Sequence, residues 1–79
     1  MLLPVMTDGR FIAVDGRVLR RARRDRALSQ QDLSAATGVA QATLSDLERG
    51  KRGARASTVR KLAEALGVEP KELMEEERA

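Results

Sequence analysis

The chain has 79 residues, a length that suits one small domain, and it carries 15 Lys or Arg against 12 Asp or Glu. It contains neither histidine nor cysteine, which excludes a disulfide, the usual zinc ligands and a nucleophile–histidine pair. Phe11 is its single aromatic residue, too few for stacking unpaired bases on aromatic rings, so a nucleic-acid partner would be a duplex.

Charge is unevenly distributed along the chain. Residues 1–68 carry 13 Lys or Arg and 7 Asp or Glu, a net charge of +6, whereas residues 69–79 carry −3. A basic body suggests a polyanionic partner, although solvated arginines on helix faces give the same count. No apolar run approaches the roughly 20 residues of a membrane span, and no charged segment precedes the opening MLLPVM. We expect a soluble, cytoplasmic and nucleoid-associated protein without a signal peptide, metal or cofactor.

The first 14 residues contain two short apolar runs, residues 2–6 and 11–14, on either side of Asp8 and Gly9. An Asp-Gly pair between such runs favours a β-hairpin, because a type I′ turn needs positive φ at both central positions. Pro4 lacks the N–H that a central strand would donate, so its strand would be an edge. A frayed arm is the alternative. We expect residues 1–14 to form a hairpin or arm, and residues 15–79 to form a helical domain with an acidic C-terminal tail.

Two helices are predicted next, each with a recognisable cap. Asp15 is a suitable N-cap for a helix over residues 16–25, in which apolar residues share one narrow face and arginines fill most other positions. Ser29 and Asp32 form an acidic variant of the capping box at the start of a second helix. Gly38 suits the end of that helix, where positive φ is least costly for glycine.

Three further helices complete the predicted fold. A third helix covers residues 41–49, with Leu44 and Leu47 on its buried side, and a fourth runs from about Ser57 until Gly67 ends it. A short last helix opens at Pro70, with Leu73 as its inward anchor. The fold class is therefore all-α, a compact bundle of about five helices preceded by a short N-terminal β-hairpin.

Residues 28–50 read as two short helices joined by a tight turn at Gly38, which is the pattern of a helix-turn-helix. Over residues 17–73 the chain resembles the Cro and lambda-repressor type of helix-turn-helix regulator, the xenobiotic-response-element family. The matching residues are Arg23, Leu28, Ser29, Gln30, Leu33, Gly38, Leu44, Leu47, Glu48, Arg49, Gly50, Lys51, Ala63, Leu66, Gly67 and Val68. The resemblance implies a compact bundle of about five helices and a DNA-binding role.

The chain departs from the family pattern at two positions. Ala40 stands where the family often has a serine before the recognition helix, so an N-cap hydrogen bond worth roughly 1 kcal/mol is missing. Ala54 replaces a proline that is common in the following loop, and we therefore expect a looser loop. The N-terminal hairpin is not part of the common pattern.

Four residues of the third predicted helix are candidates for reading bases: Gln41, Ala42, Ser45 and Asp46. Residues near the start of a recognition helix reach base edges, and glutamine can bond adenine at two atoms. Ala42 could contact a thymine methyl group, and Asp46 could accept from a cytosine amino group. The alternative is a plain exposed helix face.

Six residues are candidates for phosphate contacts. Gln30 and Thr43 lie near helix N-termini, where unpaired backbone N–H groups favour an anion. By analogy with the family, Arg49, Lys51, Arg52 and Arg55 hold the flanking backbone; the alternative is a solvated basic loop. The resemblance also implies that Glu48 pairs with Arg23 and locks the recognition helix to the first helix.

We therefore expect a sequence-specific regulator of transcription, a repressor rather than an enzyme, that binds double-stranded DNA as a homodimer on a palindromic operator. The dimer surface could be the hairpin or the last helix around Leu73 and Met74. The alternative is an antitoxin or other protein-interaction module whose DNA binding is autoregulatory. A toxin or polymerase would then be a partner protein.

Overall fold

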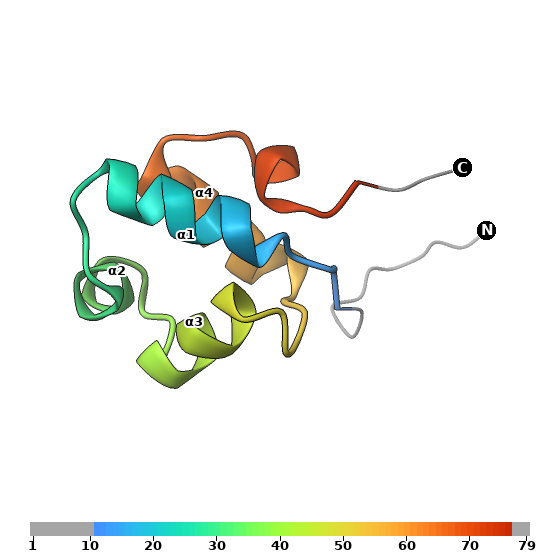
Figure 1. The fold of residues 1–79 in the computed structure, drawn as a ribbon, viewed down its shortest axis with the longest axis horizontal. Helices are drawn as coiled ribbons and strands as arrows, with labels where there is room; N and C mark the ends of the chain where they lie inside the picture. Colours follow the sequence, from blue (N-terminus) through green and yellow to red (C-terminus); the bar gives the residue numbers. More distant parts are fainter. Residues whose placement is uncertain (1–10, 77–79) are drawn as a thin grey trace.

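The computed structural model describes residues 11–76, and in this part of the chain four α-helices and one 3₁₀ helix form a single bundle (Figure 1). The helices are α1 (Gly16–Asp25), α2 (Gln30–Thr37), α3 (Gln41–Glu48), α4 (Ala56–Leu66) and the 3₁₀ helix η1 (Pro70–Leu73). In the view of Figure 1, α2 and α3 lie together on one side of α1, and α4 runs behind α1. None of these helices is long and apolar enough to cross a bilayer.

Every helix contributes leucine or valine to one shared core. Leu19, Leu33, Leu44, Leu47 and Leu62 are fully buried, and Leu73 of η1 joins them. The remaining buried apolar residues are Val14, Val39, Ala54, Val59, Ala63 and Leu66. Burying one such leucine side chain contributes roughly 1.5–3 kcal/mol, so this cluster is the main source of stability in a domain of this size.

The helix ends are fixed by the caps that the sequence predicts. The Asp15 carboxylate accepts from the backbone N–H groups of Arg17 and Val18, at 3.1 and 3.3 Å. Ser29 and Asp32 form the capping box at the start of α2, with both hydrogen bonds 2.9 Å long. Gly38 ends α2 with φ +80°. These local contacts define where the chain turns before α3 begins.

An arginine beyond α1 closes the end of α4. The Arg26 Nε donates to the carbonyl oxygen of Leu66 at 2.9 Å, next to Gly67, which ends α4 with φ +70°. A cation at a helix C-terminus interacts favourably with the partial negative charge of the exposed carbonyl groups. Arg26 therefore joins two helices that are far apart in the sequence.

Residues just before α1 run in an extended conformation between two other segments. Ile12 exchanges two backbone hydrogen bonds with Ala54, at 2.7 and 3.0 Å. On the other side, Val14 forms an isolated bridge with Met74, and Glu75 N–H donates to the carbonyl oxygen of Ala13 at 3.0 Å. Within residues 11–76 these pairings do not extend into a sheet. The turn of the predicted hairpin, at Asp8 and Gly9, lies outside the described residues.

The loop between α3 and α4 differs from the expectation of a looser connection. Ala54 is buried and held by its two hydrogen bonds to Ile12, and a Cβ on Gly53 would lie 2.6 Å from the Ile12 carbonyl oxygen. Proline at position 54 would lack the N–H that this pairing uses. Alanine therefore permits both hydrogen bonds with Ile12, whereas the common proline could only accept the one from the Ile12 N–H.

The expected fifth helix is a single 3₁₀ turn. Pro70 occupies its start, as predicted, but Met74 already has the extended angles φ −95° and ψ 146°. The chain leaves the helical path at Met74, the residue that pairs with Val14. A long-range backbone pairing thus limits η1 to four residues.

Candidate nucleic-acid interface

A threonine side chain stabilises the turn between α2 and α3 through two hydrogen bonds to the backbone. The Thr37 hydroxyl donates to the carbonyl oxygen of Leu33 at 2.7 Å and accepts from the Val39 N–H at 3.1 Å. Val39 is buried beneath the turn, and Gly38 supplies the positive φ that reverses the chain. The angle between α2 and α3 is therefore set by packing and hydrogen bonds rather than by the loop alone.

With Leu44 and Leu47 in the core, α3 presents its other side outward. Gln41 and Ala42 are exposed, and Ser45 and Asp46 are half-buried one turn later. Residues at this spacing share one helix face. Ala40 makes no side-chain cap hydrogen bond, so backbone N–H groups of the first turn of α3 remain available to an anion.

Asp46 has a partner within the protein. Its Oδ1 lies 3.5 Å from Nη2 of Arg49, and the side chains of Arg49 and Asp46 are 60% and 38% exposed. An exposed pair of this kind contributes at most about 1 kcal/mol. The sequence predicts a base contact for Asp46 and a phosphate contact for Arg49, and in the structure the two side chains lie against each other.

Arg23 and Glu48 form a buried ion pair between α1 and α3. The Nε of Arg23 donates to Oε2 of Glu48 at 2.6 Å, and its Nη2 donates to Oε1 at 3.0 Å. The third guanidinium nitrogen, Nη1, donates to the carbonyl oxygen of Leu28 at 2.8 Å. The side chains are only 11% and 5% exposed. This geometry joins α3 to α1 and to the connector that precedes α2.

The charges of this pair are stabilised by their surroundings. Burial alone would raise the pKa of Glu48, but hydrogen bonds from Arg23 and Gln30 and the charges of Arg23 and Arg20 lower it overall. The hydrogen bond to Glu48 raises the pKa of Arg23, against the opposing effect of burial. Glu48 is therefore a carboxylate at neutral pH.

Gln30 takes part in this network, a role that the sequence did not indicate. Its Nε2 donates to Oε1 of Glu48 at 3.1 Å from the first residue of α2. Nothing local in the sequence links these two positions, because the contact depends on how α2 packs against α3. The predicted phosphate contact of Gln30 stays a prediction.

Three of the predicted phosphate-binding residues line one hollow. Thr43 of α3 and Arg52 and Arg55 of the loop surround it, and α4 adds Lys61, which the sequence analysis missed. The Arg55 guanidinium lies 5.8 Å from the centre of the Phe11 ring, a cation–π distance. The hollow thus carries three positive charges from two segments beside the N-terminal half of α3.

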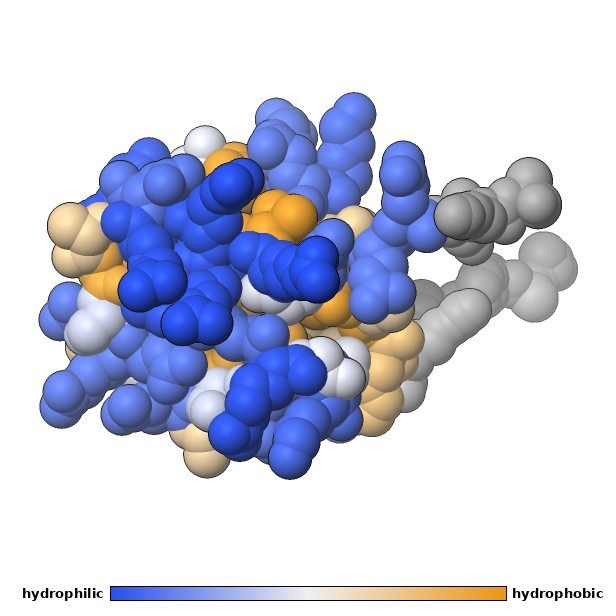
Figure 2. Space-filling model, viewed as in Figure 1, coloured by the Kyte–Doolittle hydropathy of each residue, from blue (hydrophilic) through white to orange (hydrophobic). Residues whose placement is uncertain are grey.

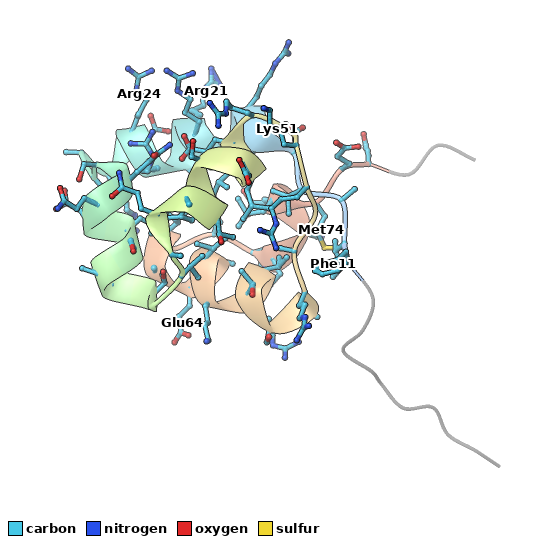
Figure 3. All side chains as sticks on the ribbon, turned by 90° about the horizontal axis from the view of Figure 1, so that it is seen from below. Phe11, Arg21, Arg24, Lys51, Glu64 and Met74 are labelled. Carbon is cyan, nitrogen blue, oxygen red and sulfur yellow. The ribbon has the colours of Figure 1, made fainter. Side chains whose placement is uncertain are left out.

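The other two predicted cations lie elsewhere. Arg49 shares a second hollow with Arg17 and Val18 of α1. Figure 3 shows Lys51 on the same side of the molecule as Arg21 and Arg24 of α1, away from Phe11. The predicted phosphate contacts therefore divide between two flanks of the α2–α3 unit. Within the described residues, no group of acidic side chains could hold a metal ion.

The chain is similar to known helix-turn-helix proteins. A family model described as helix-turn-helix, HTH_3, matches residues 19–73. An uncharacterized HTH-type transcriptional regulator of Sinorhizobium fredii, y4dJ, is 44% identical over 54 residues, which cover 68% of this chain and 70% of y4dJ. The HTH-type transcriptional repressor RghR of Bacillus subtilis is 42% identical over 60 residues, 75% of this chain but only 44% of RghR.

A solved structure shares the fold. The restriction-modification controller protein C.AhdI from Aeromonas hydrophila superposes with a TM-score of 0.70 at 37% identity, covering 75% of this chain and 89% of the controller. The family match covers the segment that holds α2, the turn and α3, and the two relatives and the solved structure each cover two thirds or more of this chain. The chain belongs to the Cro and lambda-repressor-like helix-turn-helix family, HTH_3, and is a transcriptional regulator with a helix-turn-helix DNA-binding fold.

Proposed function

We propose that this protein is a sequence-specific repressor that binds double-stranded DNA as a homodimer on a palindromic operator. The observation that carries the proposal is the outward face of α3, where Gln41 and Ala42 are exposed while Leu44, Leu47 and Glu48 anchor the opposite side. A helix held from behind and polar in front suits the major groove of a duplex.

Each part of the interface has a role in this proposal. Gln41, Ala42 and Ser45 contact base edges, with Asp46 contributing where it is released from Arg49. Gln30, Thr43, Arg49, Lys51, Arg52 and Arg55 contact phosphates and set the register. Lys61 joins them, because it lines the same hollow as Thr43 and Arg55. Repression follows from the bound protein covering a promoter.

A dimer is proposed because one α3 contacts too few base pairs for high specificity. Two half-sites would lie about 34 Å apart along the duplex. Leu73 is fully buried in its own chain, so it is not available for a subunit contact, whereas Met74 is 37% exposed. Residues 2–6, the other candidate surface, lie outside the described part of the chain.

The name of one relative supports repression. RghR is named a transcriptional repressor and C.AhdI a restriction-modification controller, so both names support a role in regulation.

Selection of bound sequences from a random duplex pool at near-physiological salt tests the proposal. We expect enrichment of a two-fold-symmetric motif with half-sites one helical turn apart. Salt-sensitive binding without an enriched motif would contradict sequence-specific recognition, because that behaviour arises from phosphate contacts alone.

A further inference from the structure

Helix α1 has an unusual distribution of arginine. Its inward side is closed by Gly16, Leu19 and Arg23, and four other arginines of the helix are exposed. We call these four the α1 basic band: Arg17, Arg20, Arg21 and Arg24. They line one hollow on the surface together with Asp25. Strongly hydrophilic residues cover the α1 side of the molecule in Figure 2.

Within residues 11–76 no acidic side chain pairs directly with this band; its one internal electrostatic effect is that of Arg20 on the pKa of Glu48. Arg23 is paired with Glu48 and Arg26 bonds the end of α4, whereas within residues 11–76 no salt bridge or side-chain hydrogen bond involves the four band residues. Like charges three and four residues apart on a helix repel each other. A surface that needs only solubility usually mixes charges of both signs. The band is therefore a cost to the isolated fold that a polyanion would offset.

The band continues into the interface on α3. Arg17 borders the same hollow as Arg49, at the end of α3, and Arg20 is near enough to Glu48 for its charge to lower the pKa of that carboxyl. Figure 3 places Arg21 and Arg24 on the same side as Lys51, with Glu64 of α4 on the opposite side. Basic side chains thus run from the flank of α3 along α1, and Asp15, Glu48 and Glu75 also line the hollow that Arg17 and Arg49 share.

We propose that the α1 basic band binds the phosphate backbone of the duplex that flanks the half-site contacted by α3. Guanidinium groups bind phosphate oxygens in a planar, two-pronged geometry. At 1.5 Å per residue the band spans about 10 Å, enough for its long side chains to reach more than one phosphate of a strand. The inference rests on the proposed function, since it extends the same DNA interface beyond the bases that α3 contacts.

The test compares a band variant with a variant of equal charge loss elsewhere. Arg21→Gln with Arg24→Gln removes two band charges without touching the Arg23–Glu48 pair. The control is Arg60→Gln with Lys71→Gln, both exposed; Arg60 shares a face of α4 with Glu64, on the side opposite the band. Binding of each protein is measured against the selected motif in a duplex of about 20 base pairs, and in one extended by about 10 on each side.

On the extended duplex, we expect the band variant to have a salt dependence shallower by about two for each bound protomer, because each phosphate contact contributes roughly 0.9. Between about 50 and 200 mM salt the wild type would then lose about tenfold more affinity per protomer than the variant does. On the short duplex the band variant and the wild type should bind alike. The control variant should match the wild type on the short and on the extended duplex.

Two results would overturn the inference. One is an unchanged salt dependence in the band variant, and the other is an equal change in the control, which would indicate general electrostatics rather than a contact. If no motif is enriched, random duplexes of the same two lengths serve as probes. The salt dependence of the band variant, compared with that of the wild type on these random duplexes, then still tests the band. This test is separate from the failure of sequence-specific recognition.

Discussion

The two sides of α3 are held in different ways. On the inward side, Leu44 and Leu47 are fully buried, and both carboxylate oxygens of Glu48 accept hydrogen bonds from Arg23. On the outward side, Gln41 and Ala42 are exposed. This helix of eight residues thus carries on one side the groups that maintain the fold, and on the other side the groups proposed to recognise DNA. Changes on the inward side should cost stability, and changes on the outward side should cost recognition.

The largest effect is expected from Glu48→Ala. This change leaves the buried Arg23 guanidinium without its partner, which should lower the free energy of unfolding by about 3–5 kcal/mol. Urea unfolding followed by circular dichroism measures this loss. The exposed pair of Asp46 and Arg49 is the control, since Asp46→Ala should cost less than about 1 kcal/mol. Equal losses in the two variants would contradict the contrast.

Gly16→Ala should have the next largest effect. An added Cβ would lie 2.6 Å from the carbonyl oxygen of Leu47 and closer still to that of Glu48. Backbone must shift to accept it, at a cost of about 1–3 kcal/mol. Thermal unfolding checks this, with Ala13→Gly as an exposed reference on the same segment. A stability equal to wild type would show that α1 and α3 do not pack as closely as described.

Ala54→Pro tests the pairing of the loop with the segment before α1. The change removes the N–H that bonds the Ile12 carbonyl oxygen, so we expect a loss of about 1 kcal/mol. The Ile12 amide donates to the carbonyl group of Ala54 in the same pairing. Weakening the pairing should therefore also make hydrogen exchange of the Ile12 amide faster. Stabilisation by proline, as expected for an unpaired loop, would refute the pairing.

The smallest effect is expected from acid. The folded state lowers the pKa of Glu48, as described above, and backbone and side-chain hydrogen bonds from Ser29 lower the pKa of Asp32. Stability from these carboxylates is present above their unfolded pKa values and is lost as the pH falls through the folded ones. The melting temperature should therefore decrease once the pH is lowered beyond about 4. This decrease should be less steep in Glu48→Gln than in the wild type. An identical pH profile in that variant would exclude Glu48 as a contributor.

Much of the fold follows from local signals in the sequence. The bounds of α1, the capping box of Ser29 and Asp32, and the ends at Gly38 and Gly67 are confirmed. Each depends on residues within one turn of the helix end. The buried leucines follow equally from their helical spacing.

The contacts that the sequence did not indicate are long-range. Ile12 meets Ala54 through backbone groups, which every residue carries, and no side-chain pattern marks such a partner. Gln30 reaches Glu48, and Lys61 reaches the hollow beside Thr43, only because helices distant in sequence pack together. Tertiary packing therefore decides which polar residues of the candidate interface lie side by side.

The most direct test of the separation between the two sides of α3 is Gln41→Ala, measured for both stability and binding. We predict that the free energy of unfolding stays within about 0.5 kcal/mol of wild type. Affinity for the selected operator should fall about tenfold or more, as expected for losing a two-point base contact. Unchanged operator affinity in a folded variant would contradict the account, because the outward face of α3 would then not be the surface that recognises DNA.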